Sequence, residues 1–282
     1  MRRPRGRHAI QNTVIGVALF VELIALSGHA LFGWWNPGPM AATPTPLTYR
    51  APQPASGQQL LLALAAVAER RAVVTPSRPT AHLPYAYVRR RSWALGGSGG
   101  ATVVRPVELE SWRRADGSGR LVSAWVSAHG PRAVTMALSA GPSLPALATT
   151  PAALARQLGL GSGADGTARP VQAFVDAADV QPIGPRMEAA FLRLLALDPE
   201  VVNSGTTVDR AGRAGDAVSI DSDFTGRAIH YTVVLDPATG SLLEVDESLL
   251  GDARGLNVQD GAVLAYTTYL GAGDTANTMT RP

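Results

Sequence analysis

The stretch AIHYTVVLDPATGSLLEVD, residues 228–246, contains the pattern from which the fold is most readily inferred. Two runs of alternating apolar residues, 228–235 and 241–246, flank the turn sequence Asp236-Pro-Ala-Thr-Gly240. Alternation with a period of two is typical of β-strands, and Asp, Pro and Gly between two such runs are typical of the turn that joins antiparallel strands. This stretch therefore predicts an antiparallel hairpin.

Further runs of the same kind lie on both sides of this hairpin. Residues 216–224 follow the turn sequence Arg210-Ala-Gly-Arg213, and residues 120–126 follow Ala115-Asp-Gly-Ser-Gly119. Turns of this composition between alternating runs predict additional hairpins. We therefore predict one antiparallel sheet, whose strands cover residues 85–93, 102–112, 120–126, 206–209, 216–224, 228–235, 241–246 and 262–270.

Two segments have the apolar spacing of amphipathic helices, and Ser56 provides an N-cap for the first of them. Thr150 and Pro151 provide the N-cap and first residue of a third, short helix. Helices do not alternate one by one with the strands, so the βαβ order of a parallel sheet is missing. The predicted fold class is therefore α+β, with one antiparallel sheet and two to four helices on one face. The predicted helices cover residues 58–72, 150–159 and 184–197.

The first 35 residues predict a membrane anchor. Thr13 to Trp35 is a run of 23 residues with one formal charge, Glu22, and a helix of that length, at about 1.5 Å per residue, crosses a hydrocarbon core of about 30 Å. The Arg residues of segment 1–12 place that segment in the cytoplasm, and Trp34 and Trp35 suit the outer membrane interface. We therefore expect a single-pass protein of the cell membrane whose C-terminal domain is extracytoplasmic.

A cleaved secretory signal peptide is the alternative, because Gly28 and Ala30 provide small residues at the −3 and −1 positions of a cleavage site. Beyond the span, closely spaced prolines predict an extended stalk. The predicted division is a cytoplasmic segment 1–12, a transmembrane signal anchor 13–35, a stalk 36–56, an extracytoplasmic domain 57–272 and a flexible tail 273–282.

Composition excludes several classes of chemistry. The 282 residues include no Cys, and all 25 basic residues are Arg, which excludes disulfides, Cys-ligated metals, thiol catalysis and mechanisms that need a Lys. Gly161-Ser-Gly-Ala-Asp-Gly166 has the spacing of a dinucleotide-binding loop but follows a predicted helix, so it is predicted to be an ordinary loop. We assign no catalytic residue, metal or cofactor and predict that the protein is not an enzyme.

The charges are unevenly distributed along the chain. The net charge of +3 belongs to residues 1–42; residues 43–156 hold 13 Arg against 4 acidic residues, and residues 157–282 hold 8 Arg against 17. A surface for nucleic acid is therefore not expected. Attraction between the two halves is the simpler interpretation, and a basic patch facing lipid headgroups or an acidic partner is the alternative. A solvated acidic edge, or otherwise a weak Ca²⁺ site, is predicted at Asp221, Asp223, Glu244, Asp246 and Glu247.

The order of motifs between residues 57 and 246 resembles a family of actinobacterial single-pass membrane proteins whose genes often lie beside extracytoplasmic-function sigma factors. More distantly, a helix followed by an antiparallel sheet resembles the lipoprotein-carrier half-barrel. The second resemblance implies a curved sheet, with helices over its concave face and an apolar cavity for acyl chains. The motifs that carry the first resemblance, to the actinobacterial family, are residues 60–71, 85–93, 110–120, 144–154, 187–197, 209–213 and 235–240.

These features together predict a membrane-anchored binding or sensing module of the bacterial cell envelope, with a lipid or lipoprotein as its ligand. The predicted cavity lining consists of bulky residues on elements that face one another: Leu60, Leu64, Tyr85, Tyr87, Trp93, Trp112, Trp125 and Phe191. The alternative is a regulatory partner of another membrane protein in a sigma-factor-linked signalling system. Its predicted contacts to an envelope protein or to headgroups are Arg89, Arg90, Arg91, Arg113 and Arg114.

Overall fold

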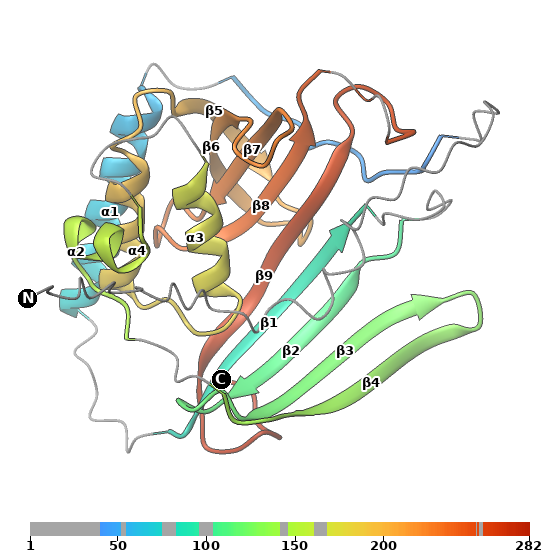
Figure 1. Cartoon of the computed structure of the whole chain (residues 1–282). Coiled ribbons are helices and arrows are strands. Elements are labelled where there is room, and N and C mark those ends of the chain that lie inside the picture. Colours follow the sequence, from blue (N-terminus) through green and yellow to red (C-terminus); the bar gives the residue numbers. More distant parts are fainter. Residues whose placement is uncertain are drawn as a thin grey trace, which may run out of the picture.

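The computed structural model describes residues 40–51, 55–74, 83–95, 104–141, 146–160, 168–251, 253 and 256–282. Within these ranges the chain forms nine strands in one antiparallel sheet and four helices (Figure 1). The predicted cytoplasmic segment, the membrane span with Glu22, Trp34 and Trp35, and the first part of the stalk lie outside the described residues. No helix in the described ranges is long and apolar enough to cross a membrane.

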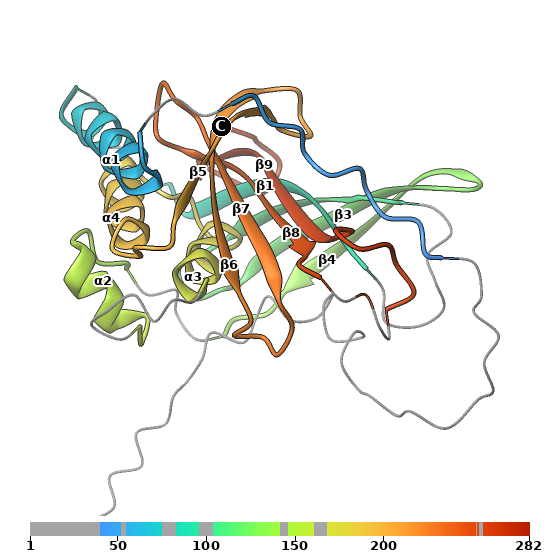
Figure 2. The same cartoon turned by 90° about the horizontal axis from the view of Figure 1, so that it is seen from above.

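The sheet consists of two runs of consecutive hairpins, which β9 joins by pairing with both β1 and β8. The strand order is β4-β3-β2-β1-β9-β8-β7-β6-β5, so β4 and β5 are the two edges of a sheet that is curved and not closed (Figure 2). The strands are β1 Tyr85–Ala94, β2 Val107–Arg113, β3 Gly119–Ser127, β4 Gly130–Leu138, β5 Val202–Val208, β6 Ala214–Ser222, β7 Ile229–Leu235, β8 Leu242–Leu249 and β9 Val263–Thr275.

The helices gather on one side of the sheet, at its β5–β9 half (Figure 1). They are α1 Gly57–Val74, α2 Pro151–Gln157, α3 Arg169–Ala178 and α4 Pro185–Leu195. Leu64, Phe174 and Phe191 of the helices pack with Ile220 and Tyr231 of the strands in one apolar cluster. Burial of these side chains provides the main driving force for the packing of helices on the sheet. The predicted α+β class, with a curved antiparallel sheet and helices on one face, is confirmed.

Helix α1 lies against the turn between β7 and β8. Gly240 in this turn has a φ of +74°, and a Cβ there would lie 2.7 Å from the carbonyl oxygen of Leu64. Arg71 donates a hydrogen bond of 2.9 Å to Ser241 Oγ and pairs with the buried Glu188 of α4. The turn sequence that predicts the hairpin therefore also positions α1 and α4 on the sheet.

Two elements, α3 and β4, are missing from the sequence-based prediction. The Gly-rich segment before Arg169-Pro170 favours a loop, but Val171, Phe174 and Ala178 recur at helical spacing and are buried. Pro fits the first turn of a helix, because the N–H that it lacks has no partner there. Strand β4 begins at Gly130-Pro131 and lies on the surface, so burial imposes no strong alternation on its sequence.

The segment predicted as a tail, residues 273–282, contacts the sheet. Strand β9 continues past residue 272 to Thr275. The following residues lie against β2, where Trp112 Nε1 donates to the carbonyl of Thr280 at 2.7 Å and the Arg281 guanidinium makes two hydrogen bonds of 2.7 Å to Glu110. Burial acts to raise the pKa of Glu110, but hydrogen bonds from Arg281 and Tyr87 hold this pKa below its usual range. The carbonyl of Thr280 and the guanidinium of Arg281 thus join the end of the chain to β2.

Candidate functional site

The cover on the helix side of the sheet ends between β2 and β3. Residues directly opposite each other in antiparallel strands point to the same face, and Val88, Ser111, Leu121 and Met136 form such a row from β1 to β4. The exposed fraction is 2% at Val88, 5% at Ser111 and 46% at Met136, and Leu121 is half-buried. Strands β3 and β4, residues 119–138, thus form an open wing, which extends away from the helices in Figure 1.

A second row shows that this face is the one covered by the helices elsewhere. Arg90, two residues along β1 from the first row, pairs with Asp179 just beyond α3, with Nη1 and Oδ2 3.0 Å apart. From Arg90 the row passes through Leu109 and Ser123 to Val134, which is 47% exposed. The apolar side chains that the register places on this face of the open wing are Leu121, Trp125, Val134, Met136 and Leu138.

The outer edge of β4 has backbone groups that point away from the sheet. A two-residue turn joins β3 and β4, and the residues that flank such a turn, Ser127 and Gly130, form a hydrogen-bonded pair. Hydrogen-bonded pairs recur at every second residue, so the N–H and C=O of Val134 also bond to β3. The residues between these positions point their N–H and C=O groups away from the sheet. Pro131 belongs to the outward set, where its missing N–H breaks no bond within the sheet. In the described ranges no strand pairs with the outward set, which is Pro131, Ala133, Thr135 and Ala137.

The opposite edge of the sheet, β5, is covered by the chain itself. Arg50 forms a β-bridge to Thr206, with N and O 2.8 Å apart, and Thr207 donates its hydroxyl to the carbonyl of Thr48 at 2.8 Å. Figure 2 shows the segment 40–51, in blue, crossing this half of the molecule. Natural sheets protect their edges because an unpaired edge binds other strands. The contrast makes the open wing the candidate site for binding another protein.

The electrostatics of the open wing favour an acidic partner. Glu108 on β2 pairs with Arg89 at 2.6 Å and with Arg91 at 3.4 Å, and Glu110 pairs with Arg281. Arg132 on β4 is exposed and forms no ion pair with another described residue. The register places Arg132 on the same face as Val134 and Met136, so this apolar surface has an uncompensated positive charge at one end.

The five Arg residues predicted to contact a partner do not form one patch. Strand β1 lies inside the sheet rather than at a solvated edge, because β9 returns from far along the chain and pairs with it. Arg90 points to the helix side, whereas Arg89 and Arg91 pair with Glu108 on the opposite side. Arg113 is buried, and its Nε has no hydrogen-bond partner among the described residues. Burial and the neighbouring Arg90 lower the pKa of Arg113. Of the five, Arg114 is exposed to solvent, whereas the three Arg residues of β1 are half-buried.

The eight residues predicted to line a cavity lie in separate places. Leu60, Leu64 and Phe191 belong to the core between helices and sheet, where the Phe191 ring stacks on that of Phe174 with centroids 4.4 Å apart. Trp93 packs instead in a small separate cluster with Val263 and Tyr266. On the face opposite the helices, the rings of Tyr87 and Trp112 contact each other with centroids 5.0 Å apart. Tyr85 and Trp125 are half-buried.

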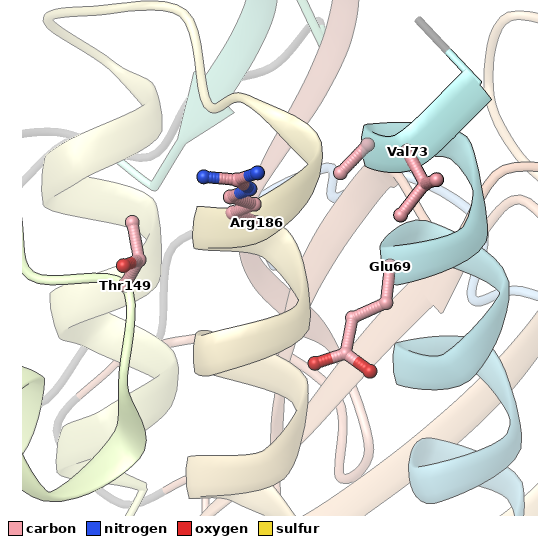
Figure 3. A pocket seen from close by; sticks show the side chains of 5 residues that line it. Glu69, Val73, Thr149 and Arg186 are labelled. Atoms are coloured by element: carbon pink, nitrogen blue, oxygen red, sulfur yellow. The ribbon is translucent and has the colours of Figure 1, made fainter. Parts of the chain in front are cut away.

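Neither of two surface hollows is lined by any of these eight residues. The first, of about 290 Å³, lies between α1, α4 and the segment before α2 and is lined by Glu69, Ala72, Val73, Thr149 and Arg186 (Figure 3). The second, of about 310 Å³, lies near the tip of the open wing and is lined by residues 104–106 and 126–128. Both volumes are at the lower limit for small-molecule sites, roughly 300 Å³.

Of the five acidic residues predicted to form a solvated edge, Asp221 and Asp223 are exposed and Glu247 is half-buried, but Glu244 and Asp246 are buried around an Arg. Glu244 and Asp246 are 0% and 2% exposed, and Arg210 pairs with both and lies 4.2 Å from the centroid of the Tyr266 ring. The Thr45 carbonyl accepts a further hydrogen bond from Arg210 at 3.1 Å. Burial raises the pKa of both carboxyls, and Arg210 opposes this rise. Within the described part of the chain no group of three or more His, Asp or Glu is arranged to hold a metal ion.

Of the residues on the open wing, Trp125 is among the site residues predicted from the sequence, as a cavity residue, and those of β4 are not. Arg132, Val134, Met136 and Leu138 recur in steps of two directly after the turn that ends β3. This repetition is the signal of the second strand of a hairpin. This strand signal is weakened by Gly130-Pro131 at its start and by the small residues that alternate with the four, Ala133, Thr135 and Ala137.

No protein-family model matches the chain, and no curated protein matches it in sequence. Among solved structures, the chain is similar to MucB in the crystal structure of MucB in complex with MucA(peri), with 15% identity and a TM-score of 0.31. That match covers 76% of this chain and 55% of the MucB chain, so this chain spans about half the length of MucB. An inactive mutant of the CurK dehydratase matches with 13% identity and a TM-score of 0.14, over 81% of this chain and 83% of that chain. These likenesses are too low to support a shared function, and the resemblance to an actinobacterial family stays a prediction.

Proposed function

We propose that this chain is a membrane-anchored, extracytoplasmic binding module that recognises a protein segment through the open wing and catalyses no reaction. The observation that supports the proposal is the row that ends at Met136, where one continuous face of the sheet passes from buried to open. An apolar sheet face beside an unprotected strand edge is the form of a β-strand docking site. In this proposal residues 13–35 hold the module at the membrane, and regulation of an envelope partner follows from the binding.

A protein ligand fits the open wing better than a lipid does. The outward N–H and C=O groups of β4 need hydrogen-bond partners, which a peptide backbone supplies and an acyl chain lacks. The apolar side chains between the helices and β5–β8 pack against one another, and the hollows on the surface include the charged residues Glu69, Arg186 and Arg105. These two hollows therefore do not supply the purely apolar cavity that the lipid-binding alternative requires.

Site-specific photo-crosslinking tests the proposal. Benzoylphenylalanine replaces Met136 in the full chain, in the cell that produces it, and a matched variant carries it in place of Leu62, which is 50% exposed on α1. We expect ultraviolet light to join position 136, but not position 62, to another protein. Adducts of lipid mass alone, adducts with a second copy of the chain alone, or equal adducts at both positions would contradict the proposal.

A further inference from the structure

We propose that the partner of the open wing is an extended acidic segment, which adds to β4 as a tenth, antiparallel strand with the residue order apolar-x-apolar-x-acidic. This inference rests on the proposed function and adds the chemistry of the partner. It is derived from three properties of β4: which backbone groups are unpaired, which side chains share the open face, and where the positive charge lies.

The backbone fixes the register of an added strand. Ala133, Thr135 and Ala137 each point an N–H and a C=O outward, so residues opposite these three form the hydrogen-bonded pairs. Residues opposite Val134 and Met136 then occupy non-hydrogen-bonded positions, where side chains of two strands approach most closely. An antiparallel partner thus places two of its residues, separated by one, beside the two exposed apolar side chains of β4.

The side chains fix the chemistry at those positions. Val134 and Met136 are 47% and 46% exposed, and apolar partner residues bury them. Two residues further along the partner lies the position opposite Arg132, which has no carboxylate among the described residues. An Asp or Glu there completes a cross-strand ion pair, whereas a Lys or Arg is opposed by a like charge. The other face of the partner meets Ala133 and Thr135, which accept small or polar residues.

A second copy of β4 does not meet these requirements. In an antiparallel pair centred on Val134 of both copies, Arg132 lies opposite Met136 at each end. Such a pair supplies no carboxylate, and it places two uncompensated Arg residues on one face. A different chain is therefore the expected partner.

Peptide binding to the full chain in detergent micelles tests the inference. The probe is fluorescein-labelled Thr-Val-Thr-Val-Thr-Glu-Thr, and its control has Lys in place of Glu. We expect fluorescence anisotropy to show saturable binding of the Glu peptide that is about tenfold tighter than that of the Lys peptide, since charges across an interface act mainly on specificity. Arg132→Glu should reverse this preference.

Two further variants separate backbone pairing from charge. Thr135→Pro removes an outward N–H without breaking a bond to β3, so it should weaken binding of the Glu peptide while the thermal unfolding curve still shows a folded protein. Arg105→Glu makes the same charge reversal at an exposed position outside the row and should leave the preference unchanged. Equal affinity for both peptides, an unchanged preference in Arg132→Glu, or undiminished binding to Thr135→Pro would overturn the inference. If position 136 crosslinks to a protein and the peptides show no preference, the proposed function stands and this inference fails. If position 136 crosslinks to no protein, the proposed function fails as well.

Discussion

At the scale of single residues, Arg210 stabilises the buried charges of the sheet. Its guanidinium pairs with Glu244 and Asp246 of β8, which lies between β7 and β9 in the sheet. Arg210 also donates a hydrogen bond to the Thr45 carbonyl of segment 40–51. A buried carboxylate without its cation retains the cost of desolvation and loses the compensating attraction. The two ion pairs of Arg210 therefore matter mainly because they offset the desolvation cost of the buried carboxylates, and they add little net stability.

Replacing Arg210 with Met should lower the free energy of unfolding by about 3 to 5 kcal/mol at pH 7. Burial raises the pKa of Glu244 and Asp246 in the folded protein, and without Arg210 the rise is larger. A carboxyl with a higher pKa folded than unfolded destabilises the fold as pH rises through the folded pKa. The loss of unfolding free energy in the variant should therefore shrink as pH falls towards the carboxyl pKa values of the unfolded chain, near 4. Urea unfolding at pH 7 and pH 5 measures the difference in unfolding free energy between wild type and variant, and Arg156→Met, at an exposed position, is the control. An equal deficit at both pH values would show that these carboxyls do not cause it.

At the scale of elements, the turn between β7 and β8 holds α1 in place through Gly240. Gly226 has a similar backbone, with a φ of +86°, but no atom lies within 4 Å of the position of its missing Cβ. Gly226→Ala should thus cost about 1 to 2 kcal/mol of stability from backbone strain alone. Gly240→Ala should cost about 1 kcal/mol or more beyond that, because the Cβ also overlaps the Leu64 carbonyl. Thermal unfolding compares the two variants, and equal losses would mean that α1 does not depend on this close approach.

The same elements show how far the sequence predicts the fold. The hairpin of residues 228–246 and the helix near residues 184–197 are predictable, because alternation, helical spacing and turn residues are local signals. The position of β1 in the sheet is not predictable, because β1 pairs with β9 and Arg90 and Tyr269 lie far apart in the sequence. The open wing is missed for a related reason. Exposure of Val134 and Met136 depends on which strand is last in the sheet, and no local pattern encodes that order.

At the scale of the whole molecule, the two edges of the sheet are treated differently. The β5 edge is bridged by Arg50, from the segment that connects towards the predicted anchor, and the β4 edge is left unpaired in the described residues. The two oppositely charged halves of the sequence meet in pairs such as Arg71 with Glu188 and Arg90 with Asp179. Arg132 has no such pair with another residue that the structure describes, which leaves positive charge at the unprotected edge.

Residue-resolved amide hydrogen exchange along β4 of the full chain, with and without the Glu peptide, shows whether a strand adds to this edge. We expect the amides of Val134 and Met136 to exchange slowly in both samples, since they bond to β3. Those of Ala133, Thr135 and Ala137 should exchange fast in the free protein and slowly with the peptide. Slow exchange at the three outward amides without peptide would show that the edge is already covered, and fast exchange with peptide would show that no strand adds there; either result would contradict the claim.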